Sequence, residues 1–183
     1  MTLMELQTKR LKLVELIFAD LENIHKLHSL PEVDEYNTLG LPTTIHTTDI
    51  LLNEWLDQKQ LAPRSSYIFC IKQFDTNHFV GLIALILGKE NFKIAEVWYK
   101  ILPEYWRQGL ATEALMRILY FGFTDLGLHR IEAGCAVENM ASIKVLEKTG
   151  MTKEGSKRKV LPIRGNWVDN YFYAILDTDF HYR

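Results

Sequence analysis

The stretch YWRQGLATEALM, residues 105–116, runs from two aromatic residues through a single glycine, Gly109, directly into strong helix formers. No Ser, Thr, Asp or Asn stands directly before the predicted helix to cap it. A glycine turn at a helix start exposes several backbone N–H groups and the positive end of the helix dipole, and it can therefore bind phosphate. An ordinary strand-to-helix turn remains the alternative, because the sequence has neither a P-loop nor the three-glycine dinucleotide fingerprint.

The other residue types that often carry chemistry show no comparable spacing. Cys70 and Cys135 both lie in apolar, strand-like runs, which favours reduced thiols in the core over a disulfide and indicates a cytoplasmic protein. The six histidines have no metal-ligand spacing, so the sequence predicts no metal site.

Length and composition narrow the class of protein. A chain of 183 residues with 48% hydrophobic and 24% charged residues predicts one globular domain spanning residues 1–183. The net charge of −2 and the lack of a long Lys/Arg run argue against a nucleic-acid partner. The first ten residues contain no apolar block, so we expect no secretory signal, and the ordinary overall composition gives no reason to expect a membrane partner.

The periodicity of apolar residues predicts a mixed α/β (α+β) arrangement. Strands are expected at 10–16, 66–73, 79–87, 92–101, 130–137, 151–160 and 167–176. Helices are expected at 20–30, 48–60, 109–126 and 141–149. Residues 31–42 form a long irregular segment, and loops of that length in compact domains are often functional. The last two strands are expected to be joined across residues 162–166.

Two further sequence blocks follow the Gly109 turn. They are Asn139-Met-Ala-Ser142 and the Leu-Glu-Lys-Thr-Gly-Met run at residues 146–151. Together with Gly109 and Ala111, which match the last two anchors of the motif Gln/Arg-x-x-Gly-x-Gly/Ala, residues 95–155 resemble the GNAT acetyltransferase superfamily. Within it, the chain is similar to the RimJ/RimL-like branch of ribosomal-protein N-terminal acetyltransferases. Trp106 at the first anchor departs from the superfamily motif, although this substitution is common in the branch.

The resemblance implies a GNAT fold and acetyl-CoA as cosubstrate. That fold has a mixed, mostly antiparallel sheet of about seven strands, helices on both faces, and a splay between strands four and five, here 92–101 and 130–137. The pantetheine arm would lie in the splay and pair with the backbone of Trp98, Tyr99 and Ile101. The pyrophosphate would lie on the turn formed by Arg107, Gln108, Gly109, Leu110, Ala111 and Thr112.

Asn139 and Ser142 each have a structural and a functional interpretation. Asn139 is a favoured N-cap residue, and the resemblance adds a contact with the cofactor. Ser142 could simply satisfy the helix start, whereas the resemblance makes its hydroxyl the group that protonates or stabilises the leaving thiolate.

The general base is not defined by the sequence. Glu96, expected to be half-buried by alternation with Trp98 and Lys100, is the preferred candidate, with Glu138 and Asp169 as alternatives. A glutamate that some members of the branch carry before the last strand pair corresponds here to Leu161. Water-relayed deprotonation, or an acceptor that arrives neutral, therefore also stays open.

The resemblance implies direct acetyl transfer to a primary amine, without a covalent enzyme intermediate. The N-terminal α-amino group of a protein is the preferred acceptor, with Tyr36 and Asn37 as acceptor contacts. A small amine (an antibiotic, polyamine or amino acid) and a non-catalytic acyl-CoA-binding module are the alternatives. A homodimer is one open assembly state.

Overall fold

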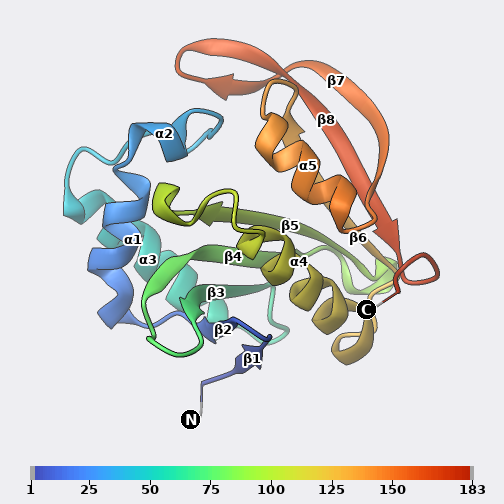
Figure 1. Ribbon diagram of the computed structural model, residues 1–183, viewed down its shortest axis with the longest axis horizontal. Coiled ribbons are helices and arrows are strands. Elements are labelled where there is room, and N and C mark those ends of the chain that lie inside the picture. The colour runs from blue at the N-terminus through green and yellow to red at the C-terminus, as the bar shows by residue number, and fades with distance from the viewer. Residues whose placement is uncertain (1–2, 182–183) are drawn as a thin grey trace.

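The computed structural model describes residues 3–181, and one eight-stranded sheet organises them (Figure 1). The strand order is β1-β2-β3-β4-β5-β6-β8-β7. The strands are β1 (Glu5–Gln7), β2 (Leu11–Glu15), β3 (Ser66–Gln73), β4 (Phe79–Leu87), β5 (Ile94–Ile101), β6 (Arg130–Ala136), β7 (Thr152–Ile163) and β8 (Asn166–Leu176). The mixed, mostly antiparallel sheet is confirmed, and the additional strand is β1, which has only three residues.

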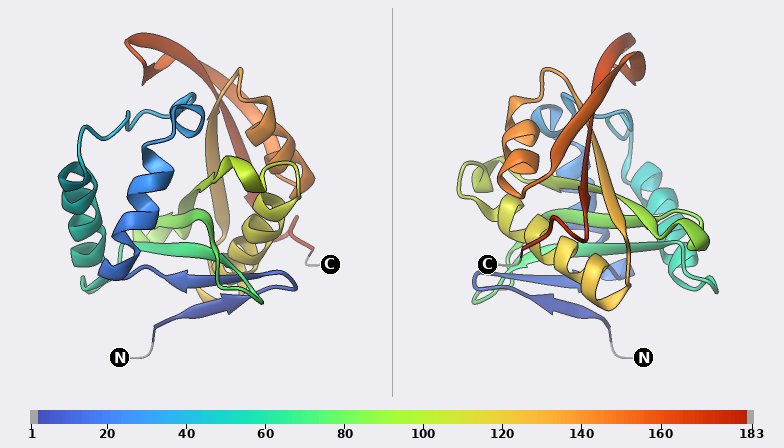
Figure 2. Two further views of the ribbon diagram at one scale, coloured as in Figure 1. Left: turned by 60° about the vertical axis from the view of Figure 1, so that its left-hand side comes forward. Right: turned by 90° about the vertical axis from the view of Figure 1, so that its right-hand side faces the viewer.

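Two hydrophobic clusters hold helices against opposite faces of the sheet. Successive side chains of a strand point to opposite faces, so Ile68 on β3 joins one cluster and its neighbour Phe69 joins the other. The Ile68 cluster packs on α1 (Leu21–His28) and α3 (Ile45–Lys59), whereas the Phe69 cluster packs on α4 (Leu110–Tyr120). Figure 2 shows α1 and α3 gathered on one side of the molecule, away from α4. Helices therefore cover both faces, as predicted.

The splay lies where the sequence resemblance implied it. The parallel pair β5–β6 matches only Ile94 to Glu96 with Arg130 to Glu132. Beyond Glu96, β5 continues along β4 as far as Ile101, while β6 continues along β8 as far as Ala136. The two strands therefore separate, and each leaves one backbone edge without a strand partner.

Two connections differ from their predicted form. Residues 31–42 were expected to be irregular, but Pro31 starts a short helix, α2 (Pro31–Asp34), because proline suits the first helical position. The expected loop at residues 162–166 shrinks to a two-residue turn, since β7 runs to Ile163 and β8 starts at Asn166. Both turn residues, Arg164 (φ 47°) and Gly165 (φ 76°), adopt the left-handed conformation that suits a tight hairpin.

The remaining predicted helices are present with shifted ends. The predicted helix at 109–126 is an α-helix only to Tyr120 and continues as a π-helical turn over Phe121–Asp125. The helix α5 (Met140–Lys148) follows β6 and lies beside the splay (Figure 1). Within residues 3–181, no helix is long and apolar enough to cross a membrane.

Candidate active site

The turn before α4 has the conformation that a phosphate cradle requires. Gly109 is the N-cap residue with φ 75°, and Arg107 is also left-handed with φ 60°. No side chain caps the helix start. The first-turn N–H groups, those of Leu110, Ala111 and Thr112, therefore have no intrahelical acceptor. An anion at this position would meet several donors and the positive end of the helix.

Arg10, a residue that the sequence analysis did not identify, lies against this turn. Its Nη1 donates to the carbonyl of Gln108 at 3.0 Å, and its Nε lies 2.6 Å from Oε2 of Glu113 on α4. The hydroxyl of Thr8 also donates to Glu113, at 2.6 Å. Although burial raises the pKa of Glu113, hydrogen bonds from Thr8 and Arg10 bring it below its usual range. The β1–β2 turn thus fixes the first turn of α4 and holds a guanidinium beside the cradle.

A pair of hydroxyl groups spans the splay. Tyr99 of β5 and Ser142 of α5 approach to 2.9 Å between Oη and Oγ. Asn139 caps α5, because its Oδ1 accepts from the backbone N–H of Ser142 at 3.0 Å, so its structural role is present. Burial raises the pKa of Tyr99 despite the hydrogen bond to Ser142, and the phenol stays protonated. The splay therefore contains a linked pair of O–H groups.

One backbone acceptor of β5 is already engaged. The carbonyl of Ile101, expected to be free, accepts from Nε1 of Trp106 at 2.7 Å. Trp106 thereby ties the end of β5 to the turn that leads to Gly109. The backbone of Trp98 and Tyr99 lies in the part of β5 that has separated from β6.

The predicted base is more exposed than expected. Glu96 is exposed rather than half-buried, and it lies at the last paired register position, opposite Glu132. Loss of solvent contact and the neighbouring Glu132 carboxylate still raise the pKa of Glu96. Of the alternatives, Glu138 is exposed, and Asp169 accepts from the backbone N–H of Lys159. None of the three is brought next to Ser142 by a hydrogen bond within residues 3–181.

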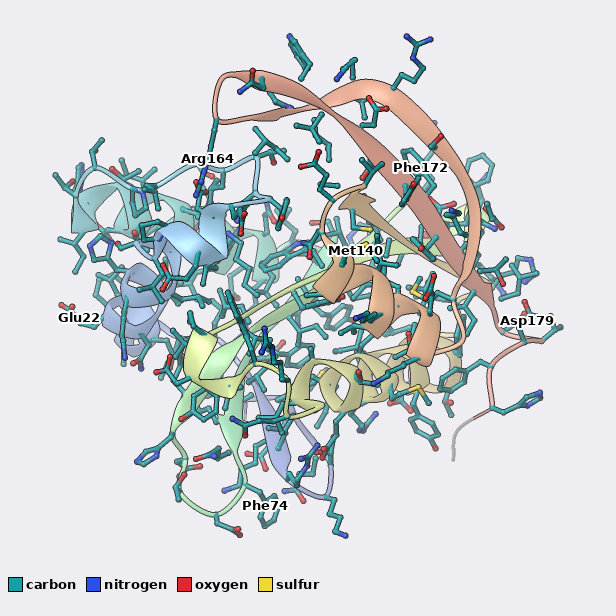
Figure 3. All side chains as sticks on the ribbon, turned by 45° about the horizontal axis from the view of Figure 1, so that its top comes forward. Glu22, Phe74, Met140, Arg164, Phe172 and Asp179 are labelled. Carbon is teal, nitrogen blue, oxygen red and sulfur yellow. The ribbon has the colours of Figure 1, made fainter. Side chains whose placement is uncertain are left out.

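A cavity of about 460 Å³ opens between residues 31–41 and the β7–β8 turn. Asp34, Asn37 and Arg164 contribute its polar lining. Arg164 donates from Nη2 to the carbonyl of Pro31 at 2.5 Å, so the hairpin contacts α2 across the cavity. In Figure 3 the side chain of Arg164 lies above α2, at the tip of the hairpin.

Of the two predicted acceptor contacts, only Asn37 lines this cavity. Its Oδ1 accepts from the backbone N–H of Leu39 at 3.2 Å. Tyr36 is half-buried, and limited solvent contact together with Glu35 and Glu138 raises the pKa of its phenol. The carboxylate of Glu138, just before α5, therefore interacts electrostatically with the phenol of Tyr36.

These features define a class of protein. A splayed parallel strand pair, an uncapped glycine turn at a helix start and a hydroxyl pair at a second helix start fit a thioester of coenzyme A. Among residues 3–181, no group of three or more His, Cys, Asp or Glu side chains is arranged to hold a metal.

Comparison with known proteins identifies the family. Residues 10–152 match the acetyltransferase (GNAT) domain model, and the chain belongs to the GNAT acetyltransferase family. It is 31% identical to the uncharacterized N-acetyltransferase YnaD of Bacillus subtilis over 97% of this chain and 100% of that protein. The chain is an acetyl-CoA-dependent N-acetyltransferase.

Solved structures agree on the fold. The spermidine N-acetyltransferase of Vibrio cholerae, in complex with CoA and spermine, has a TM-score of 0.83 and 26% identity, covering 94% of this chain and 98% of that chain. RimJ of Mycobacterium smegmatis, in complex with CoA-disulfide, has a TM-score of 0.81 and covers 95% and 86%, but at 21% identity it supports the fold alone.

Proposed function

We propose that this enzyme acetylates the N-terminal α-amino group of a peptide or protein. The observation that carries the proposal is the cavity of about 460 Å³ between residues 31–41 and the hairpin turn, which opens to solvent. A cavity of this size accommodates the first residues of a chain, and its opening lets the remaining chain leave. The polar lining of the cavity also suits the N-terminus of a peptide. Asp34 and Asn37 can bind its amino group, and Arg164 can bind its carbonyl oxygens.

Different residues would bind the pyrophosphate and the pantetheine arm of the cosubstrate. Leu110, Ala111 and Thr112 would donate backbone N–H groups to the pyrophosphate, with Gly109 allowing its close approach. Arg107 and Gln108 would add side-chain donors, and Tyr99 and the N–H of Ile101 would present backbone groups to the pantetheine arm, whereas the backbone of Trp98, also expected to do so, faces β4 and the Ile101 carbonyl is held by Trp106. The capping side chain of Asn139 would contact the same arm.

The reaction is direct attack of a neutral amine on the thioester. Acetyl-CoA supplies the activated acyl group, and the backbone of β5 would polarise its carbonyl. Ser142, in contact with Tyr99, would protonate or stabilise the departing thiolate. Burial raises the pKa of Cys135 to about 11, so this thiol is poorly suited to act as a nucleophile, which supports direct transfer.

A small polyamine is the second candidate acceptor. The likeness to the spermidine N-acetyltransferase structure and the buried Asp34 carboxylate in the cavity favour it. The two buried, unpaired cysteines support a reducing, cytoplasmic location for either activity.

An acetyl-CoA turnover assay separates the candidates. The panel contains peptides with a free N-terminus, the same peptides blocked at the N-terminus but carrying an internal lysine, spermidine and single amino acids. Thiol release measures turnover, and mass spectrometry locates the acetyl group. Acetylation of free peptides but not of their blocked forms supports the proposal, whereas turnover confined to spermidine supports the second candidate.

A further inference from the structure

Lys100 occupies a position in the splay that the proposed chemistry has not used. It lies on β5 beyond Glu96, the last residue paired with β6. Alternation along the strand places it on the same side as Trp98, whose ring packs against Trp55 of α3 at 5.8 Å. Its side chain therefore faces the α1 and α3 side of the sheet, which also carries the cavity at residues 31–41.

The surroundings of Lys100 are unusual for an ammonium group. Its residue is only partly exposed, and within residues 3–181 no hydrogen-bond acceptor contacts it. Asp34 of α2 and His28 of α1 interact with it electrostatically, and both are buried, at 5% and 4% exposure. Asp34 Oδ1 and His28 Nε2 have no hydrogen-bond partner. Burial of these atoms is costly unless water or a polar ligand such as an ammonium group binds them.

The charges around this cluster leave Lys100 poorly neutralised. The other cation near Asp34 is Arg164, whose Nε lies 3.8 Å from Oδ2, beyond hydrogen-bonding distance. His28 adds no negative charge, and the second titratable group that acts on it is another histidine, His25, whose Nδ1 lies 2.8 Å from Oγ1 of Thr48. Burial lowers the pKa of Lys100 to about 8, while Asp34 opposes that shift. At a pKa of about 8, roughly a tenth of the Lys100 side chains are neutral amines at pH 7 and about half are neutral at pH 8.

We propose that Lys100 is the general base that removes a proton from the acceptor's ammonium group before attack. The inference rests on the proposed function and completes it, because the base was the undefined part of the site. Asp34 acts as a positioning residue, since it can hold the incoming ammonium close to Lys100. Glu96 is less suited to this role because it is exposed and lies at the paired end of β5.

The proton and electron balance of the step is complete. The acceptor R–NH3⁺ transfers one proton to Nζ of neutral Lys100, and its nitrogen lone pair forms the C–N bond to the acetyl carbonyl carbon. The C–S bond then breaks. The amide nitrogen loses a second proton, and the sulfur gains one through the hydroxyl of Ser142. Lys100 returns its proton to solvent, and the products are the acetamide, the thiol and one free proton.

Variants of Lys100 test the assignment through the pH dependence of kcat on one acceptor. The wild-type rate should rise with pH through about 8 and then level off, because only neutral Lys100 is active. Lys100→Met removes the base, and Lys100→Arg keeps a cation that does not deprotonate. Both variants should therefore lower kcat about 100-fold or more, and their pH–rate profiles should lack the rising limb, the increase of kcat with pH that the wild type shows near its midpoint. Lys89→Arg, at an exposed position in the β4–β5 turn, is the matched control and should behave as wild type. A Lys100→Arg enzyme that keeps the wild-type rate and limb overturns the assignment.

Asp34→Asn tests the direction in which the midpoint of the pH–rate profile moves. It removes the negative charge that raises the pKa of Lys100, so the limb should move to lower pH even if the variant also binds acceptor more weakly. An unmoved limb, or one that moves to higher pH, contradicts a role for Lys100. Glu96→Gln should leave the limb in place, whereas its loss in that variant would assign the base to Glu96.

A measurement without turnover separates this inference from the proposed function. Reductive methylation with ¹³C-formaldehyde labels lysines, and the Lys100 resonance is identified by its loss in Lys100→Arg. Its titration midpoint should lie near 8, and a midpoint near the ordinary lysine value would overturn the inference. If the wild type acetylates no amine, both proposals fail. If it does so while Lys100 variants keep the limb, only the base assignment fails.

Discussion

At the scale of single residues, the hydroxyl pair Tyr99–Ser142 joins the two sides of the splay. The 2.9 Å contact links β5 to the start of α5, so either O–H can pass a proton toward a sulfur in the gap. Burial keeps the Tyr99 phenol protonated, which leaves it available as a donor. In the proposed reaction, the pair would act on the leaving thiolate rather than on the incoming amine.

Ser142→Ala should lower turnover by about 10- to 1,000-fold while the affinity for acetyl-CoA changes little, because the contact strengthens only as charge develops on sulfur. The cap should survive, since Asn139 accepts from the backbone N–H of residue 142 rather than from its side chain. Steady-state kinetics and calorimetry measure the two quantities. Tyr99→Phe is the companion variant, and a loss seen only in it would move the donor role to the phenol. Equal turnover by Ser142→Ala and the parent would reduce Ser142 to a helix-start residue.

Single residues also show what the sequence could not reveal. Asn139 and Ser142 were found because they form a short local motif. Lys100 and Arg10 belong to no such motif, and their roles depend on interactions with residues far along the chain: an electrostatic one with Asp34 and an ion pair with Glu113. Residue type and spacing carry no signal for such contacts. Glu96 was expected to be half-buried from strand alternation, but it is exposed, because alternation predicts the face of a sheet and not what covers that face.

At the scale of elements, the start of α4 has the geometry that the proposed phosphate site needs. The left-handed Gly109 turns the chain into the helix, and Glu113 in the first turn is secured by Thr8 and Arg10 from the β1–β2 turn. An acidic residue in the first turn suits the helix dipole, while the guanidinium of Arg10 offsets its charge near the cradle. The start of α4 therefore depends on a turn, between β1 and β2, that is distant in the sequence.

Substitution at Gly109 tests the phosphate cradle. Asn and Asp have nearly the same shape, and both meet the same backbone strain at φ 75°, so Gly109→Asn and Gly109→Asp differ mainly in one negative charge. Gly109→Asp should bind acetyl-CoA at least about tenfold more weakly than Gly109→Asn, a difference of about 1.4 kcal/mol from like-charge repulsion. Calorimetry gives the affinities, and circular dichroism confirms folding. Equal affinities of the two folded variants would exclude phosphate at this turn.

The elements themselves were largely predictable, whereas their ends were not. Seven of the eight strands were given by alternation and β-branched content, and only the three-residue β1 was missed because so short a segment has little period. The helix α2 was missed because the predicted loop composition outweighed the Pro31 start signal. The hairpin turn was expected to span residues 162–166, but it is shorter because Arg164 adopts φ above zero, which is uncommon for a residue other than glycine.

At the scale of the whole molecule, one side of the sheet carries buried titratable groups. Burial first, and then Lys100 and His25, lower the pKa of His28 to about 3. The unfolded chain takes up a proton near the ordinary histidine value of 6.5, while the folded chain does not. The contribution of His28 therefore leaves stability unchanged above that pH, and it lowers stability as the pH falls from 6.5 toward 3.

His28→Phe tests this linkage. The variant keeps an aromatic ring against Trp55, whose ring centroid lies 6.0 Å from that of His28, but it does not titrate. Between about pH 7 and about pH 5, the wild type should lose about 2 kcal/mol more of its free energy of unfolding than the variant. Urea unfolding at both pH values measures the difference. Parallel losses in the two proteins would show that His28 is free to protonate in the folded state.

The acidic character of residues 31–42 also belongs to the whole molecule. In the sequence, Glu32, Asp34 and Glu35 form one acidic group, with no basic residue within residues 31–42. We call this group the acidic rim. In the structure, its three carboxylates differ in exposure. Asp34 is buried and lies near Arg164 of the hairpin, whereas Glu32 and Glu35 are exposed. Only the two exposed carboxylates can attract a cationic acceptor from solution, because Asp34 acts after the acceptor has entered the cavity.

Neutralising the exposed pair alone should therefore reveal steering. In Glu32→Gln/Glu35→Gln, the kcat/KM for a cationic peptide should fall by about two- to fivefold at low salt, and its salt dependence should flatten, since added ions screen the same attraction in the parent. The KM for acetyl-CoA, an anion, should not rise. Glu5→Gln/Glu90→Gln is the matched control, because it removes two exposed carboxylates from β1 and from the β4–β5 connection and changes net charge equally. Equal losses in both double variants would assign the effect to net charge. A parental salt slope in Glu32→Gln/Glu35→Gln would show that the rim does not guide the acceptor, and capture would then depend on Asp34 and the cavity alone.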